Sequence, residues 1–99
     1  MGEFSFMGRQ ITVNGEGAKD SPFVVTGTGY NPALAASIEN HIVGLCFRDK
    51  EWFLKGTRLE IGSSGERLAI LTIRFFADDE ELLQTEMWFD VSEAFTQGN

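Results

Sequence analysis

His41 is the first side chain to consider for chemistry, because it is the only histidine in the chain. Imidazole titrates near neutral pH and commonly serves as a general acid or base. At about 100° per residue, His41 falls at the edge of an apolar helical stripe, where it could face a pocket between helix and sheet. Ser37 lies one turn earlier, but there is no Gly-x-Ser-x-Gly motif and no third group is identifiable. The alternative is a boundary histidine that only packs at the rim of the core.

Cys46 is the only cysteine, so an intramolecular disulfide is excluded. One cysteine and one histidine are also too few for a zinc site made by the protein alone. A nucleophilic thiol needs a lowered pKa, which a helix N-terminus or a neighbouring cation provides. Cys46 falls near the C-terminal end of the expected helix, so we interpret it as a buried structural thiol.

The segment Gly27–Asn31 (GTGYN) has the outline of an anion-binding loop, because two glycines precede a helix whose first N–H groups are free. Its spacing matches neither Gly-x-Gly-x-x-Gly nor a phosphate loop with Gly-Lys-Ser/Thr. Tight-turn glycines leading into a helix capped by Asn31, with Pro32 at the first helical position, explain the same residues. Both interpretations stay open.

The acidic residues give no complete metal or catalytic motif. Asp78–Glu81 (DDEE) lacks the spacing of an EF-hand loop, so we interpret it as a solvated turn and expect no bound metal. Glu86 and Asp90 lie on one face of an expected strand, roughly 13 Å apart, which is too far for a glycosidase pair. We therefore lean towards a protein that is not an enzyme, and we expect no cofactor.

Charge is segregated along the chain. Residues 1–74 carry eight acidic and eight basic side chains, whereas Phe75–Asn99 carries seven acidic side chains and no basic one, so the net charge of −7 lies in the last quarter. Such a surface attracts cationic partners and disfavours nucleic acids and anionic membranes, which require Lys and Arg. A basic protein is therefore the expected class of partner.

The length of 99 residues indicates a single domain, 1–99. Strand-type and helix-type periodicities predict the α+β class, with one helix packed across a curved antiparallel sheet. Met1–Met7 lacks the regions of a signal peptide, so we expect a flexible extension or a vector-derived remnant there, and a frayed tail over 93–99. The expected order is ββαβββ, with strands near 9–14 and 22–27, a helix from about 32 to 43 or 46, and strands near 52–61, 67–76 and 82–91. This layout resembles cystatin-like and hot-dog folds, which implies a tendency to dimerise and a pocket between helix and sheet.

The last three expected strands can be tested for a consistent register. If Arg74 faces Glu86, the pairs Phe75–Thr85, Ile73–Met87, Leu71–Phe89 and Ala69–Val91 form one nearly all-apolar face. The Gly65 turn sets Ile61 opposite Arg67 and brings Leu59 and Phe53 to the same face. We expect the helix to pack there.

The opposite face mixes apolar and charged side chains, whereas a solvated face would be polar throughout. We therefore interpret it as a surface that something covers. The cover could be a second copy of the chain, the N-terminal segment with Phe4, Phe6 and Met7, or a foreign partner or ligand. The interface candidates are Trp52, Leu54, Leu68, Ile70, Arg74, Phe76, Glu86 and Trp88.

Two functions follow as expectations. The first is a cytoplasmic, homodimeric, non-enzymatic interaction module that offers an acidic hairpin (Asp78, Asp79, Glu80 and Glu81) to a basic partner. The second is a small-molecule binder or weak acid–base enzyme with a pocket formed by Tyr30, His41, Phe53 and Met87.

Overall fold

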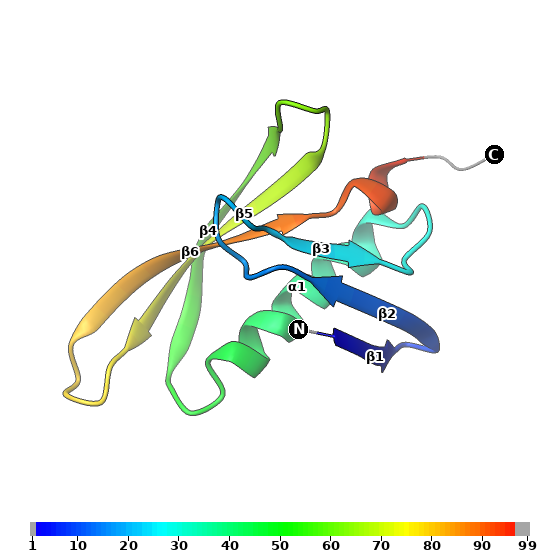
Figure 1. Cartoon of the computed structure of the whole chain (residues 1–99). Helices are drawn as coiled ribbons and strands as arrows, with labels where there is room; N and C mark the ends of the chain where they lie inside the picture. Colours follow the sequence, from blue (N-terminus) through cyan, green and yellow to red (C-terminus); the bar gives the residue numbers. More distant parts are fainter. Residues whose placement is uncertain (1, 97–99) are drawn as a thin grey trace.

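The computed structural model describes residues 2–96. One helix lies across a curved sheet, which confirms the predicted α+β class (Figure 1). The elements are β1 (Gly2–Phe6), β2 (Arg9–Asn14), β3 (Phe23–Thr26), α1 (Pro32–Cys46), β4 (Trp52–Ile61), β5 (Arg67–Phe76), β6 (Leu82–Asp90) and the 3-10 helix η1 (Ser92–Phe95). No helix within these residues is long and apolar enough to cross a membrane.

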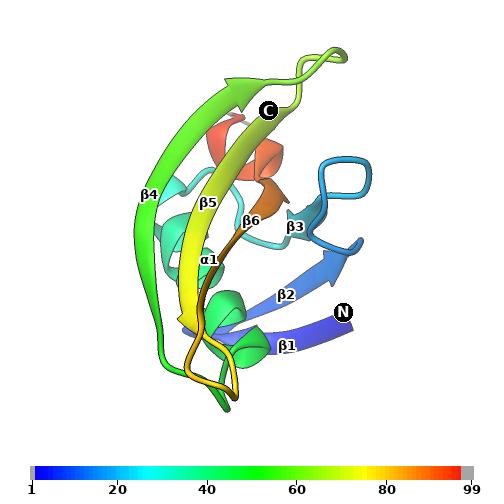
Figure 2. The same ribbon diagram turned by 90° about the vertical axis from the view of Figure 1, so that its left-hand side faces the viewer.

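The sheet has six strands in the order β1-β2-β3-β6-β5-β4, and it is mixed rather than purely antiparallel. Its one parallel junction joins β3 to β6 through Phe23↔Phe89 and Val24↔Asp90. This junction unites an N-terminal three-stranded unit with the C-terminal meander. Figure 2 shows β4 and β5 arching past α1.

Both ends of the described chain are more ordered than the sequence suggested. Gly2–Phe6 pairs with β2 along its whole length, and its side chains alternate between half-buried and exposed. Phe4 and Phe6 pack against the core, as does Phe95 of η1. Of the tail expected to fray, residues 97–99 lie outside the described part.

Asn31 caps α1 as predicted, since its side chain accepts the N–H of Leu34 at 3.0 Å, with Pro32 at the start of the helix. The helix continues past Gly44 to Cys46. It buries an apolar face against β2, β3, β5 and β6, and that core includes Ile11, Val13, Val25, Leu34, Ala35, Ile38, Ile42, Val43, Leu71, Ile73 and Phe89.

The predicted β5–β6 register was wrong by two residues. Arg74 pairs with Gln84, and Glu86 lies opposite Thr72. The turn is tighter than expected because the N–H of Ala77 donates to Glu81 at 2.9 Å, and Glu80 adopts a φ of 66°. An even shift leaves every side chain on the same face, so the apolar pattern alone could not detect it.

The predicted β4–β5 register holds from Ile61↔Arg67 as far as Gly56 and then breaks at a β-bulge around Lys55. Beyond the bulge, Trp52 pairs with Phe75, and Phe53 pairs with Arg74. The extra residue reverses the alternation of side chains. Trp52 therefore packs against the core, whereas Phe53 moves to the opposite face, the reverse of the prediction.

Candidate functional site

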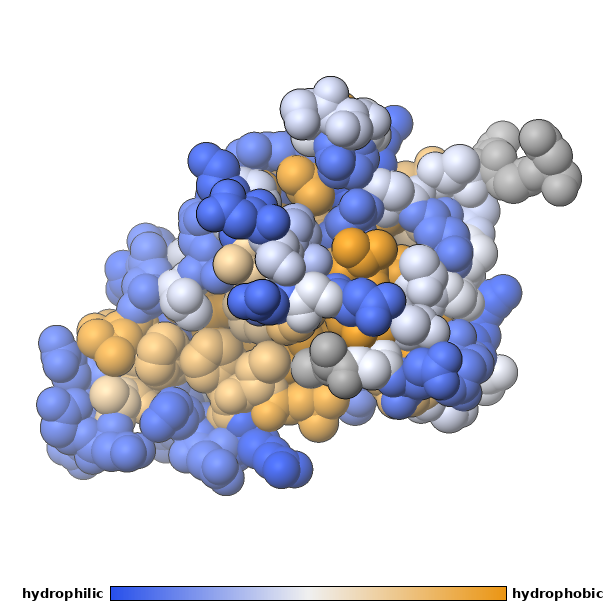
Figure 3. Space-filling model, viewed as in Figure 1, coloured by the Kyte–Doolittle hydropathy of each residue, from blue (hydrophilic) through white to orange (hydrophobic). Residues whose placement is uncertain are grey.

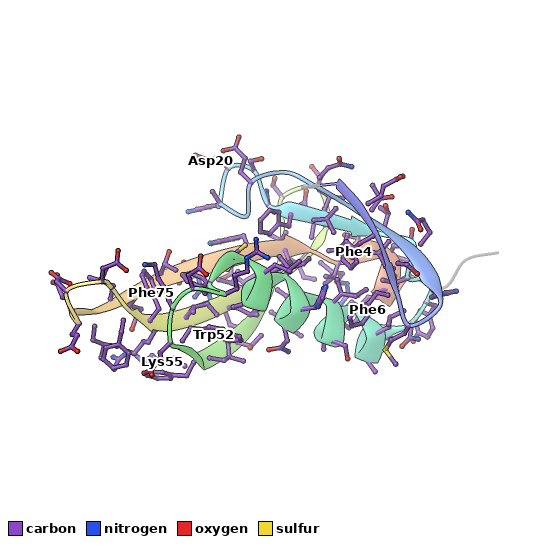
Figure 4. All side chains as sticks on the ribbon, turned by 90° about the horizontal axis from the view of Figure 1, so that it is seen from below. Phe4, Phe6, Asp20, Trp52, Lys55 and Phe75 are labelled. Atoms are coloured by element: carbon purple, nitrogen blue, oxygen red, sulfur yellow. The ribbon has the colours of Figure 1, made fainter. Side chains whose placement is uncertain are left out.

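The four residues expected to form a pocket between helix and sheet do not come together. His41 is exposed, and the centroid of its ring lies 5.4 Å from the ring centroid of Phe4 and 5.0 Å from that of Phe6. Figure 4 shows these two phenylalanines between β1 and α1. Tyr30 is exposed, Phe53 is on the other face of the sheet, and Met87 is buried in the core. The surroundings of His41 match the alternative interpretation, a boundary histidine that packs at the rim of the core.

The face expected to bind a second copy is covered in its centre by the chain itself. Ile70 and Trp88 are buried, and the backbone N–H of Trp88 donates to the carbonyl of Gly17 at 2.8 Å. Gly17 belongs to the β2–β3 loop, and Lys19 and Asp20 of this loop line a hollow together with Leu68 and Asp90 of that face. Figure 4 shows Asp20 on the side of the sheet away from α1. The cover is therefore this loop and not the N-terminal segment.

The remaining residues of that predicted interface have separate environments. Arg58 lies 5.7 Å from the Trp88 ring and binds Glu86 and Glu60, each at 2.8 Å. The hydrogen bond from Arg58 to Glu86 lowers the pKa of Glu86 below its ordinary value. Trp52 and Leu54 lie on the helix face, Leu68 and Arg74 are half-buried, and Phe76 is exposed.

The glycine loop before α1 does hold an anion, and the chain supplies it. Glu93 Oε2 accepts the N–H groups of Gly27 and Gly29, each at 2.8 Å, and the hydroxyl of Thr28 at 3.2 Å. Burial alone would raise the pKa of Glu93, but these donors outweigh it and lower the pKa. The loop is therefore an internal carboxylate site, which the sequence could not reveal because Glu93 is far away along the chain.

Two further titratable groups differ from the sequence-based picture. Cys46 is exposed, so its assignment as a buried thiol was wrong, although partial burial still raises its pKa. Glu39, which the sequence did not single out, is 7% exposed on α1, and burial raises its pKa to about 7. No group of three potential metal ligands occurs among the described residues.

The acidic turn between β5 and β6 is fully presented to solvent. All four of its acids are exposed. Lys50 Nζ lies 3.2 Å from Asp78, and the N–H of Glu81 donates to Asp79 at 3.1 Å. Asp79 therefore shapes the turn, while Glu80 and Glu81 make no ion pair within residues 2–96.

Large apolar side chains surround this turn. Figure 3 shows one face of the molecule, where an orange region lies over the end of the hairpin with hydrophilic residues at its rim. Isolated exposed apolar residues are ordinary, but several large ones gathered at one end of a sheet indicate a binding surface. The apolar hairpin patch consists of Phe53, Phe76 and Leu82 on the face away from α1 and of Leu54 and Leu83 on the helix face, each between 37% and 46% exposed.

A shallow hollow of about 390 Å³ lies where the acidic turn meets this patch, and Glu51, Phe76 and Glu80 line it. The N–H of Phe76 donates to the carbonyl of Glu51 at 3.0 Å, which fixes the first two lining residues side by side. The hollow therefore combines an exposed aromatic ring with two carboxylates. Sequence reasoning missed Glu51, because it precedes β4 and reaches the turn only through strand pairing.

The acids of the C-terminal quarter are only partly available to a partner. Asp78 and Glu86 form ion pairs, Asp90 accepts from Ser92, and Glu93 fills the glycine loop. The free negative charge is therefore concentrated at the tip of the hairpin. No protein-family model, curated protein or solved structure matches this chain.

Proposed function

We propose that this chain is a non-enzymatic binding module that captures a basic protein partner through the end of its β5–β6 hairpin. The observation that carries the proposal is the hollow formed by Glu51, Phe76 and Glu80, at the junction of the acidic turn and the apolar hairpin patch. The proposed setting is the cytoplasm, where a free, exposed Cys46 would stay reduced.

The lining of the hollow suits the side chain of a lysine or an arginine. A cation over an exposed aromatic ring gains about 0.5–1 kcal/mol. The carboxylates of Glu51 and Glu80 can accept hydrogen bonds from the same cation, and charge-assisted bonds are stronger than neutral ones. These terms are modest, so the hollow supplies specificity for a cation more than affinity.

The apolar hairpin patch supplies the rest of the binding energy. Interfaces generally place apolar and aromatic side chains at the centre and charged groups at the rim. Here Phe53 and Leu82 lie on one face of the hairpin and Leu54 and Leu83 on the other, next to the acidic turn. The expected partner segment therefore combines apolar residues with Lys or Arg.

The test is binding of a short amidated peptide of alternating Leu and Arg, measured by titration calorimetry, with a Leu–Glu peptide as the matched ligand control. We expect the E51Q/E80Q variant to bind the Leu–Arg peptide about tenfold more weakly. The matched protein control is E16Q/D20N, which removes the same charge from the β2–β3 loop and should bind like the wild type. Phe76→Leu should also weaken binding, because it keeps an apolar side chain but removes the ring.

Equal loss of binding in both double variants would show that only the net charge matters and would contradict the hollow as the site. Equal binding of the two peptides by the wild type would contradict a basic partner altogether. The measurement should be repeated in about 0.5 M salt, where the contribution of the exposed charges is expected to fall.

A further inference from the structure

Strand β4 forms one edge of the sheet, and its second half is regular. From Gly56 to Ile61 it pairs with β5 without interruption, and no described strand lies on its other side. Every residue from Phe53 to Ile61 is exposed. An edge of this kind presents a row of unpaired N–H and C=O groups that another strand can bind.

The direction of these backbone groups follows from the turn at the end of β4. The N–H of Gly62 donates to Glu66 across the turn at 2.8 Å, so it points towards β5. Because the direction alternates along a strand, Thr57, Leu59 and Ile61 turn their N–H and C=O groups to the open edge. These three residues therefore offer hydrogen bonds to a new strand.

The same three residues place their side chains on the helix face, but beyond the reach of the helix. Leu59 is 67% exposed and Ile61 is 61% exposed. Leu59 and Ile61 line a small hollow of about 80 Å³, whose other lining residues are Glu60, Arg67, Leu68 and Phe95. Edge strands are usually protected by lysine, proline or bulges, and here the bulge and Lys55 protect only the first half of β4.

We propose that β4 pairs in antiparallel fashion with β4 of a second copy of this chain, about a twofold axis at Leu59. In this register Leu59 faces Leu59 of the second copy, and Thr57 faces Ile61. The pairing would form about six backbone hydrogen bonds, two for each mutually bonded pair. It would also bring the exposed Leu59 and Ile61 of both copies together on the helix face.

Charge selects this register over its neighbours. With the axis at Leu59, Arg58 of each copy lies opposite Glu60 of the other, in the type of pair where side chains approach most closely. An axis one residue earlier would set Arg58 against Arg58, and an axis one residue later would set Glu60 against Glu60. Directly opposed like charges are destabilising.

In the single chain the Arg58 side chain is turned away from the open edge, across β5 towards β6. Its Nε and Nη1 donate to Glu60 and Glu86, and the guanidinium lies over Trp88. The Nη2 donors have no partner among residues 2–96, so they are the donors left for Glu60 of the second copy. The antiparallel arrangement also places the two acidic hairpins at opposite ends of the dimer, which leaves both free for the proposed basic partner.

The first experiment is light scattering on wild-type protein at up to about 200 µM, because dimer population depends on protomer concentration. We expect a mass of twice 11.0 kDa. Leu59→Lys places two like charges at the axis and should give a monomer. The matched control is Leu45→Lys, which adds the same charge at an exposed leucine of α1 and should remain dimeric.

Cysteine crosslinking then tests the register in a Cys46→Ser background. Leu59→Cys should form a disulfide-linked dimer under mild oxidation, since opposed residues in antiparallel strands lie within disulfide range. Thr57→Cys and Ile61→Cys should each fail alone but crosslink when mixed. A wild-type monomer throughout the concentration range, or a dimer that survives Leu59→Lys without the expected crosslinks, would overturn the proposal.

Discussion

Glu93 Oε2 accepts the backbone N–H of Gly29 at 2.8 Å, which joins the end of the described chain to the loop that begins α1. The same oxygen accepts the N–H of Gly27 and the hydroxyl of Thr28. A negatively charged acceptor for two backbone donors near a helix start is a strong arrangement. The contact explains why η1 is ordered although the sequence of the tail shows no strong periodicity.

Replacing Glu93 with Gln should lower the free energy of unfolding by about 1–2 kcal/mol, because charge-assisted hydrogen bonds become weaker neutral ones. The pKa of Glu93 is lowered in the folded state, so its contribution is present above the ordinary pKa of a glutamate and is lost as pH falls through the lowered value. Urea unfolding of both proteins between about pH 3 and pH 7 measures this. Glu16→Gln, at an exposed loop position, is the control. If the difference in free energy of unfolding between the wild type and Glu93→Gln stayed constant across this pH range, the contribution assigned to the carboxylate would be contradicted.

Glu39 should have the opposite effect on stability. Its pKa is raised to about 7, so the folded state binds the proton more tightly than the unfolded chain does. The contribution of Glu39 to stability should therefore be greatest below the ordinary pKa and fall as pH rises to about 7, by at most about 3 kcal/mol. Glu39→Gln should flatten this part of the stability curve and be more stable than the wild type at pH 8, as measured by urea unfolding. An unchanged slope in the variant would assign the pH dependence to another group.

Gly17 should tolerate a methyl group less well than Gly8, although both have a φ of 80°. A Cβ at Gly17 would lie 2.5 Å from the ring of Phe23, whereas a Cβ at Gly8 would have no neighbour within 4 Å. We expect Gly8→Ala to cost about 1 kcal/mol from backbone strain alone, and Gly17→Ala about 2–4 kcal/mol from strain and overpacking. Thermal unfolding of the two variants side by side provides the comparison. Equal costs would mean that the β2–β3 loop does not pack on Phe23 as described.

Deleting Lys55 should remove the β-bulge and restore simple alternation along β4. Leu54, Phe53 and Trp52 would keep their partners Ile73, Arg74 and Phe75, so Trp52 should stay on the core side and the tryptophan emission should match that of the wild type. Deleting both Leu54 and Lys55 would instead set Phe53 opposite Ile73 and Trp52 opposite Arg74, which turns Trp52 away from the core. This double deletion should lower the free energy of unfolding by at least about 2 kcal/mol and shift the emission to longer wavelength. The same emission from the single and the double deletion would contradict the bulge at Lys55.

The periodicities of the sequence determined the elements of this protein. The capped helix from Pro32, the three long strands and the α+β class all follow from local patterns, because each depends on side chains a few residues apart. The turn at Gly65 fixed the correct pairing of Ile61 with Arg67 for the same reason. The acidic turn was also visible, since its charge is contiguous in the sequence.

Tertiary structure alone decided how these elements meet. The bulge at Lys55 exchanged the faces of Trp52 and Phe53, and a shift of two residues between β5 and β6 escaped notice because it preserves every face. Five residues of β1 are too few for a periodicity to be recognised without their partner strand. The parallel junction of β3 with β6, the hollow completed by Glu51 and the bond from Glu93 to Gly29 all join residues distant along the chain. No local pattern encodes such contacts, because they form only when the complete sheet has assembled and packed against α1.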